Sequence, residues 1–466
     1  MRGSLPAIAA PAREARASFR DPAGTLFEDG GRILRSVNED ARATLEAFLE
    51  TGTARGATDR GALVRSIRLD EGLYEHERIP FPSYPYEWPA EMLHAAGVLT
   101  LELGLASLEE GFGLKDATPY NVLFRGSEAV FVDVLSFERR DPLETRWMPY
   151  GQFARTFLLP LLAHRELGMP IQSIFAGQRD GLEPEAIYQR AGMLRRCLPP
   201  FLSLVSIPKW LSGGQADYRG RLARSEEQAR FVLRGLMRSC LRQLRALKPG
   251  SGRSAWSDYL DQKSIYSAAQ RAQKEAFVEH ALAIARPRTT LDIGANEGHF
   301  SFLAARRGSS VVAIDSDPAV AGAIWREASK DGRNVLPLVV DLTRPTPAIG
   351  WKNRECASFL DRSRGHFDLV MMLAVVHHMT VTERIPLEEI FGLAEELTRG
   401  YMLIEFVAPE DPMFRRIVRG REPLYSHLTR ERFEAAAREH FEPVKSARID
   451  GLERWLYLYR RRRDID

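Results

Sequence analysis

The sequence predicts an α/β protein whose second half is built on a parallel, Rossmann-like sheet. Strand-like apolar runs alternate with helical patterns from residue 289 onward, which is typical of a parallel sheet with helices on both faces. Acidic residues close the first three of these strands, at Asp292, Asp315 and Asp341. A stretch rich in Lys, Pro, Gly and Ser, 246–260, is the expected linker to an unlike first half.

Composition sets the class of protein. A chain of 466 residues with 44% hydrophobic and 27% charged residues predicts two or three globular domains. The net charge of +3 does not by itself predict nucleic acid as a partner. Cys197, Cys240 and Cys356 form no CxxC pair, so we expect no disulfide framework, no metal site and a cytoplasmic location. No apolar run of membrane-spanning length and no membrane partner are expected, and 1–19 is interpreted as a frayed tail.

The first half, 1–245, carries one informative stretch, "LKDATPYNVLFRGSEAVFVDVLSFE". Asp116 and Asn121 lie five positions apart, and Asp133 follows twelve positions later. This spacing resembles the catalytic loop and metal-binding aspartate of protein kinases and aminoglycoside phosphotransferases, which accept a hydroxyl proton and bind magnesium. The resemblance implies an α+β kinase-like domain with a nucleotide-like site at these three residues.

The departures from the kinase pattern predict a degenerate domain. Leu114 stands where the family has histidine, and Leu135 stands where it has glycine. Residues 1–114 contain no lysine to hold phosphates on an early strand, and Arg35 is the candidate substitute. We therefore expect this half to shape or recruit a substrate; the alternative is chance spacing in an unrelated α/β domain. The segment 78–89, rich in aromatic residues and proline, is either an acceptor surface or an ordered core loop.

Two amphipathic helices are expected on either side of the linker, over 220–247 and 262–286. The predicted strands of the second half are 289–293, 310–315, 335–340, 367–373 and 400–406, followed by closing strands near 442–449 and 454–459.

The segment "TTLDIGANEGHFSFLAARRG" predicts a strand, a tight turn and a helix. Gly294 can adopt backbone angles forbidden to other residues, and Gly298 lets the helix begin close to a ligand. Asn296 stands where a pyrophosphate-binding GxGxxG motif has its second glycine, so that motif is absent. Asp315 at the next strand end can accept both hydroxyls of a ribose, and Asp341 can meet an adenine amino group.

Together these segments resemble class I S-adenosylmethionine-dependent methyltransferases. "LDIGANEGHF" is similar to the first motif of that family, without its frequent middle glycine; "VVAIDSDP", "VVDLTRP" and "FDLVMMLAVVHHM" are similar to later motifs. The resemblance implies a seven-stranded methyltransferase sheet over 261–466, with a partly antiparallel closing hairpin, and S-adenosylmethionine as cofactor. The implied cofactor contacts are Asp292, Gly294, Ala295, Asn296, Gly298, His299, Phe300, Asp315, Ser316, Asp341, Leu342 and Leu373.

Three residues are candidates for catalysis. His377 and His378 follow the fourth strand, where a histidine can act as general base toward a hydroxyl or amine. Glu405 follows on the fifth strand. Each has a structural alternative: a histidine that fixes the strand–helix turn, or a carboxylate that anchors a loop. The Asn-Pro-Pro-aromatic signature of many base and glutamine methyltransferases is absent.

The predicted function is methyl transfer to oxygen or nitrogen of an unidentified acceptor, a small molecule, glycan or peptide, with nucleic acid not favoured. The first half would aid acceptor recognition. Two alternatives stay open: a non-catalytic binding scaffold and a bifunctional kinase–methyltransferase. The basic runs 414–421 and 460–463 suit a phosphate-rich substrate, or are a solvated helix face and a charged tail.

Overall fold

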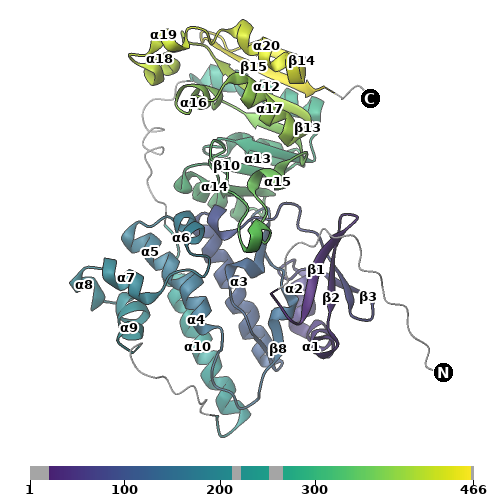
Figure 1. The fold of residues 1–466 in the computed structure, drawn as a ribbon, viewed down its shortest axis with the longest axis vertical. Coiled ribbons are helices and arrows are strands. Elements are labelled where there is room, and N and C mark those ends of the chain that lie inside the picture. Colours follow the sequence, from purple (N-terminus) through teal and green to yellow (C-terminus); the bar gives the residue numbers. More distant parts are fainter. Residues whose placement is uncertain (1–19, 212–221, 251–265, 463–466) are drawn as a thin grey trace, which may run out of the picture.

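The computed structural model describes residues 20–211, 222–250 and 266–462 (Figure 1). The N-terminal half begins with a four-stranded antiparallel sheet in the order β1-β2-β4-β3, with α1 and α2 inserted between β2 and β3. The bounds are β1 (Gly24–Asp29), β2 (Arg32–Val37), α1 (Glu39–Leu49), α2 (Gly52–Asp59), β3 (Ser66–Asp70) and β4 (Leu73–His76).

The long helix α3 (Ala90–Glu109) leads from this sheet into the region of the kinase-like stretch. Two short antiparallel pairs follow, β5 with β8 and β6 with β7, and the 3-10 turn η2 precedes the second pair. Their bounds are β5 (Phe112–Leu114), η2 (Pro119–Asn121), β6 (Val122–Arg125), β7 (Glu128–Phe131) and β8 (Phe137–Arg139). Strands β6 and β7 thus form a hairpin between Asn121 and Asp133.

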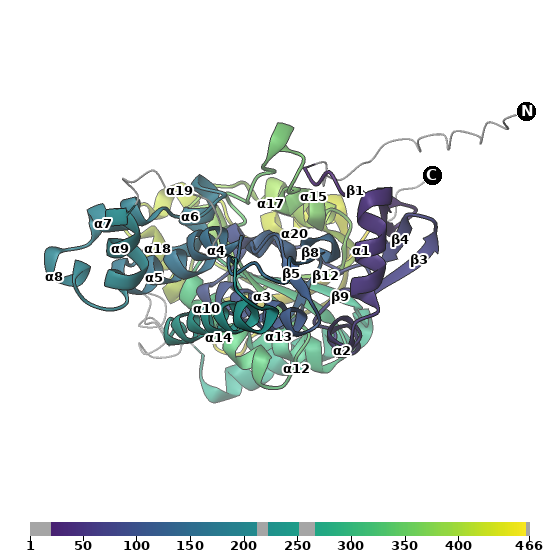
Figure 2. The same ribbon diagram turned by 90° about the horizontal axis from the view of Figure 1, so that it is seen from below.

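A helical subdomain completes the N-terminal half. In both views α7, α8 and α9 lie at one side of the N-terminal half, beyond α5 and α6 (Figures 1 and 2). The helices are α4 (Tyr150–Phe153), α5 (Leu159–Leu167), α6 (Ile171–Gly177), α7 (Pro184–Arg190), α8 (Met193–Arg196), α9 (Ile207–Leu211) and α10 (Glu226–Ala246). Helix α10 ends at Ala246, and 251–265, most of the expected linker, lies outside the described residues, as does 1–19.

Helix α3 corrects one sequence expectation. Its 20 residues are long and apolar enough, by length and composition, to cross a membrane, so the expectation that no run reaches that length was wrong. More than half of its apolar window is buried inside the protein. Buried core helices also meet this criterion, and α3 packs against α10 and β7.

The C-terminal half is a seven-stranded sheet in the order β11-β10-β9-β12-β13-β15-β14. The first five strands are parallel and β15 is antiparallel to both β13 and β14. This order confirms the predicted seven-stranded sheet with its antiparallel closing hairpin. The strands are β9 (Thr289–Ile293), β10 (Ser310–Asp315), β11 (Val335–Val339), β12 (Phe367–Met372), β13 (Thr398–Val407), β14 (Phe441–Arg448) and β15 (Arg454–Arg461).

Helices cover both faces of this sheet. They are α12 (Ala268–Ala285), α13 (His299–Arg306), α14 (Pro318–Lys330), α15 (Phe359–Ser363), α16 (Val376–Val381), α17 (Leu387–Leu397), α18 (Pro412–Val418), α19 (Glu422–Tyr425) and α20 (Arg430–His440). Alternate residues of β10 enter two different cores. Val311 and Ala313 pack with α12 and α13, whereas Val312 and Ile314 belong to a core that continues into the N-terminal half.

The two halves therefore share one hydrophobic core. Trp325 on α14 packs edge-on against Phe124 of β6, with ring centroids 5.2 Å apart. The fully buried Glu87 forms an ion pair with Arg362 of α15 and accepts a hydrogen bond from Thr346 Oγ1 at 2.5 Å. Both partners belong to the C-terminal half, so the predicted segment 78–89 is an ordered loop at the junction between the halves.

Phe81 from the same segment packs edge-on against Phe359, with centroids 5.9 Å apart, and Arg362 lies over its ring. A buried ion pair of this kind stabilises little by itself, but removal of one partner leaves a charge in the core. The junction is therefore a packed interior rather than a flexible hinge.

Candidate active site

The glycine turn after β9 has the geometry that its sequence predicts. Gly294 and Gly298 have φ angles of +70° and +76°, which non-glycine residues adopt at a cost. A Cβ atom on Gly294 would lie 3.2 Å from Val375 Cγ2, and one on Gly298 would lie 3.0 Å from Ile324 Cγ1. Both positions therefore require glycine for backbone conformation and for space, and α13 begins directly behind the turn.

Asp315, at the end of β10, is hydrogen-bonded to this turn. Its Oδ2 accepts a hydrogen bond from the Asn296 backbone N–H at 3.1 Å, and its Oδ1 accepts one from the Asp317 N–H at 3.0 Å. Burial raises the pKa of Asp315, while these backbone donors oppose that shift. An ionised carboxylate can accept about four hydrogen bonds, so both oxygens keep acceptor capacity at the edge of the sheet.

Asp292 lies one strand away and is buried. Ser301 Oγ on α13 donates to its Oδ2 at 2.6 Å, which ties the start of the helix to β9. Burial raises the pKa of Asp292 to about 6, and the nearby charge of Asp315 adds to this shift. Asp292 therefore links the strand and the helix on either side of the glycine turn.

The remaining predicted cofactor residues surround this turn or line the next strand end. Asp341 follows β11, and its Oδ1 accepts hydrogen bonds from the Thr343 backbone N–H at 2.9 Å and Oγ1 at 2.6 Å. His299 turns toward Glu275 on α12, at 3.4 Å. Ala295, Leu342 and Leu373 are buried, Phe300 is half-buried and Ser316 is exposed beside Asp315.

A buried charge cluster, which sequence reasoning did not find, surrounds Glu405. Lys274 Nζ on α12 donates to Glu405 Oε2 at 2.6 Å, and the Tyr266 hydroxyl donates to Glu405 Oε1 at 2.5 Å. Arg454 reaches Glu405 Oε1 at 3.4 Å and holds Asp411 with two hydrogen bonds, at 2.8 and 3.0 Å. The cluster comprises two cations and two carboxylates, all buried.

This cluster fixes the ionisation of Glu405. Burial raises the pKa of the Glu405 carboxyl, but the charges of Lys274 and Arg454, with the hydrogen bonds from Lys274 and Tyr266, outweigh burial and leave the pKa lowered. Both oxygens are occupied and the side chain is fully buried. The geometry fits an anchoring carboxylate better than a proton acceptor.

The two histidines begin α16 at the end of β12. His377 is buried, and its Nδ1 has no hydrogen-bond partner among the residues that the structure describes. Burial lowers the pKa of His377 well below its ordinary value of 6.5, and the charges of His378, Arg454 and Lys274 act in the same direction. The pKa of the half-buried His378 is lowered by burial and by Arg454. Both rings are therefore neutral at physiological pH.

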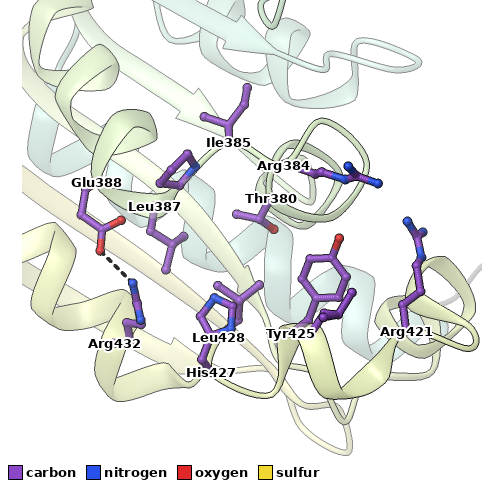
Figure 3. A pocket seen from close by; sticks show the side chains of 12 residues that line it. Thr380, Arg384, Ile385, Leu387, Glu388, Arg421, Tyr425, His427, Leu428 and Arg432 are labelled. Atoms are coloured by element: carbon purple, nitrogen blue, oxygen red, sulfur yellow. Dashed lines mark hydrogen bonds and ion pairs between the residues drawn. The ribbon is translucent and has the colours of Figure 1, made fainter.

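A small cavity beside His377 adjoins a larger pocket of about 490 Å³ (Figure 3). The two share Thr380, Leu387 and Leu428 in their linings. The full lining of the larger pocket is Thr380, Arg384, Ile385, Pro386, Leu387, Glu388, Arg421, Leu424, Tyr425, His427, Leu428 and Arg432.

The pocket combines an apolar floor with unneutralised positive charge. Arg432 is held by Glu388 at 3.4 Å. Arg384 and Arg421 have no carboxylate partner within 20–211, 222–250 and 266–462, and Figure 3 shows their guanidinium groups facing each other at one end. Arg384 has a φ of +59°, unusual for a non-glycine residue. Two converging guanidinium groups are a site for an anion.

The kinase-like stretch is brought together in the N-terminal half, but its acids are occupied. Arg35 Nη1 on β2 donates to Asp133 Oδ1 at 2.9 Å, and Ser136 Oγ donates to Asp133 Oδ2 at 2.6 Å. Asn121 Nδ2 donates to that same Ser136 hydroxyl at 3.0 Å. Asp116 accepts a hydrogen bond from Gln152 at 3.3 Å. The described residues include no group of three or more His, Cys, Asp or Glu suited to a metal ion.

Comparison with known proteins identifies a relative over the whole length. The chain is 32% identical to the nodulation protein NoeA of Rhizobium meliloti strain 1021 over 476 aligned positions. The alignment covers 97% of this chain and 98% of NoeA. No family model matches the chain.

Solved structures give partial likenesses. The N-methyltransferase NodS from Bradyrhizobium japonicum WM9 is 14% identical, with a TM-score of 0.32, over 42% of this chain and 99% of NodS. The bifunctional kinase-methyltransferase WbdD is 18% identical, with a TM-score of 0.30, over 43% of this chain and 41% of WbdD. The matched region is less than half of WbdD.

Proposed function

This chain belongs to the family of the nodulation protein NoeA, and we propose that it is an S-adenosylmethionine-dependent methyltransferase acting on an oxygen or nitrogen of an anionic acceptor. One observation carries the proposal: acids stand at the carboxyl ends of neighbouring parallel strands, beside a glycine turn that opens a helix. Ligands of open α/β sheets bind at this edge.

The residues at the edge fit the chemistry of a sulfonium nucleoside. Asp315 retains acceptor capacity for the two ribose hydroxyls, and the Gly294–Gly298 turn leaves space for close approach of backbone to ligand. The loop of Asp341 and Leu342 lies one strand further, where the adenine would bind. S-adenosylmethionine, when bound, supplies an electrophilic methyl group.

The histidines are proposed to orient the acceptor and take up its proton. His378 is the candidate general base because it is half-buried, whereas His377 is buried and one of its ring nitrogens has no hydrogen-bond partner in the described part of the chain. Their lowered pKa values keep both rings neutral and able to accept a proton near pH 7. Glu405 is assigned the anchoring role, because its carboxylate is bound on both oxygens.

The acceptor is proposed to bind in the pocket of Figure 3, with an anionic group between Arg384 and Arg421 and an apolar part on Leu424 and Leu428. A small molecule, glycan or peptide that carries a carboxylate, sulfate or phosphate has this chemistry. The expectation that 414–421 serves a phosphate-rich substrate is consistent with the position of Arg421.

The N-terminal half is proposed to support the methyltransferase rather than to transfer phosphate. The Arg35 guanidinium occupies one oxygen of Asp133 and the Ser136 hydroxyl occupies the other. A magnesium ion would have to displace both partners to bind there, against like charge from Arg35.

Isothermal titration calorimetry with S-adenosylhomocysteine tests the cofactor site. We expect the wild type to bind and Asp315→Ala to lose at least about tenfold in affinity, since hydrogen bonds to a charged group are each worth about 1.5–3 kcal/mol. Asp331→Ala, at the other edge of the same sheet, is the matched control and should bind as the wild type does. Absence of binding by the wild type would favour the non-catalytic scaffold.

The acceptor site has its own test. With S-adenosylmethionine saturating, methyl transfer to a panel of candidate acceptors, each with and without its anionic group, should show the anionic forms preferred. The Arg384→Ala/Arg421→Ala variant should lose that preference through a raised KM, whereas Arg432→Ala should lose less, because Glu388 already neutralises it. Equal use of neutral and charged acceptors by the wild type would contradict the assignment.

A further inference from the structure

Helices α8 and α9 and the segment between them lie at one side of the N-terminal half (Figures 1 and 2). They expose a set of large apolar side chains, here called the apolar end. Its members are Met193, Leu194, Leu198, Ile207, Trp210 and Leu211, with exposed fractions between 42% for Ile207 and 85% for Leu194. Single exposed apolar residues are ordinary, but six large ones within residues 193–211 are a candidate interaction surface.

Positive charge accompanies this surface. Residues 186–211 contain Arg190, Arg195, Arg196 and Lys209 and no acidic residue. Arg190 and Arg195 donate to the backbone carbonyls of Ala186 and Glu166, and Arg196 lies over the Tyr188 ring. None of these three arginines has a carboxylate partner in the described part of the chain. Lys209 is paired with Glu185.

The charge and apolar character of this surface favour one of two possible binding partners. A second copy of the chain would meet the apolar end through the same surface in a two-fold dimer, which brings two positively charged surfaces together. An anionic lipid surface offers opposite charge to the arginines and an apolar layer to Trp210, Met193 and Leu194. Tryptophan at the level of the headgroups is itself typical of membrane interfaces.

We propose that the apolar end docks the protein onto an anionic membrane surface, with the six side chains inserted at the headgroup level and the arginines against lipid phosphates. This contrasts with the sequence expectation of no membrane partner, which considered only spanning segments. Helices α8 and α9 lie away from the C-terminal sheet (Figure 1). The apolar end is independent of the proposed methyltransferase site.

Co-sedimentation of the full chain with vesicles tests the proposal. We expect binding to vesicles that contain phosphatidylglycerol, little binding to phosphatidylcholine alone, and a loss of binding as salt rises. Leu194→Asp/Trp210→Asp should abolish sedimentation, and Arg195→Glu should weaken it by more than about fivefold. Trp351→Asp, at an equally exposed tryptophan of the C-terminal half, is the matched control and should sediment as the wild type does.

Two further measurements test whether the variants remain folded and whether the protein associates with itself. Circular dichroism should show unchanged folding for all of these variants, since each altered side chain is exposed. Light scattering coupled to gel filtration reports self-association. Wild type that stays in the supernatant with anionic vesicles would overturn the proposal. So would a concentration-dependent dimer that Leu194→Asp dissolves, because the apolar end would then be an interface between copies.

Discussion

The charge cluster around Glu405 predicts a large and pH-dependent loss of stability for Lys274→Met. The variant keeps most of the unbranched side chain but removes its charge, which leaves the fully buried Glu405 without its 2.6 Å ion pair. Removal of one partner of a buried pair costs about 3–5 kcal/mol. Arg454 at 3.4 Å and the Tyr266 hydroxyl still reach Glu405, so we expect the lower end of this range, about 3 kcal/mol.

The sign of the pH dependence follows from Glu405. In the wild type its pKa is lowered, so its contribution to stability is present above the unfolded value of 4.5 and is lost as pH falls through the folded pKa. Without Lys274, burial raises that pKa. The stability difference between wild type and variant should therefore widen as pH rises from about 4 to 7.

Urea denaturation followed by circular dichroism measures this difference. Lys330→Met removes an exposed lysine that pairs with Glu327 and should cost less than about 1 kcal/mol. Lys274→Met/Glu405→Gln removes the stranded charge and should recover part of the loss. The reasoning is refuted if Lys274→Met costs no more than Lys330→Met. It is also refuted if the loss of stability in the double variant equals the sum of the losses measured for Lys274→Met and Glu405→Gln alone.

Three further predictions concern the turn, its supporting acid and the kinase-like stretch. Gly298→Ala should lower the melting temperature more than Gly308→Ala, because both have positive φ but only the first added Cβ meets another side chain within 4 Å; equal shifts would argue against the packing explanation. Asp292→Asn should gain stability relative to wild type as pH rises through about 6, since a raised folded pKa makes ionisation of the native state costly; a pH-independent difference in urea midpoints would contradict this. Mg–ATP should give no thermal shift, because Arg35 holds Asp133; a shift abolished by Asp133→Ala would restore the bifunctional alternative.

The parallel strands were predictable to within one or two residues because strands covered on both faces are continuous apolar runs. The predicted runs 289–293 and 310–315 coincide with β9 and β10. The contact between Asp315 and the turn at Asn296 follows from the same pattern, since carboxyl ends of adjacent parallel strands meet at one edge.

Long-range pairs were not predictable. Lys274 and Glu405 are 131 positions apart, and Arg454 and Asp411 are 43 apart, so no local spacing links them. A lysine on the buried side of an amphipathic helix was the available signal. The same applies to Arg35 and Asp133, 98 positions apart: the sequence suggested Arg35 as a substitute for lysine but not that it would neutralise the acid.

The shared core at Trp325, Phe124 and the Glu87–Arg362 pair has a genetic consequence. Recombination that exchanged only one half of the gene would bring together two interior surfaces that had never been selected against each other. Phe81 and Phe359 would then meet foreign neighbours, and Arg362 would lose its counter-ion. The two halves are therefore expected to be inherited as one unit, and substitutions at Glu87 to be tolerated only with a compensating change at Arg362.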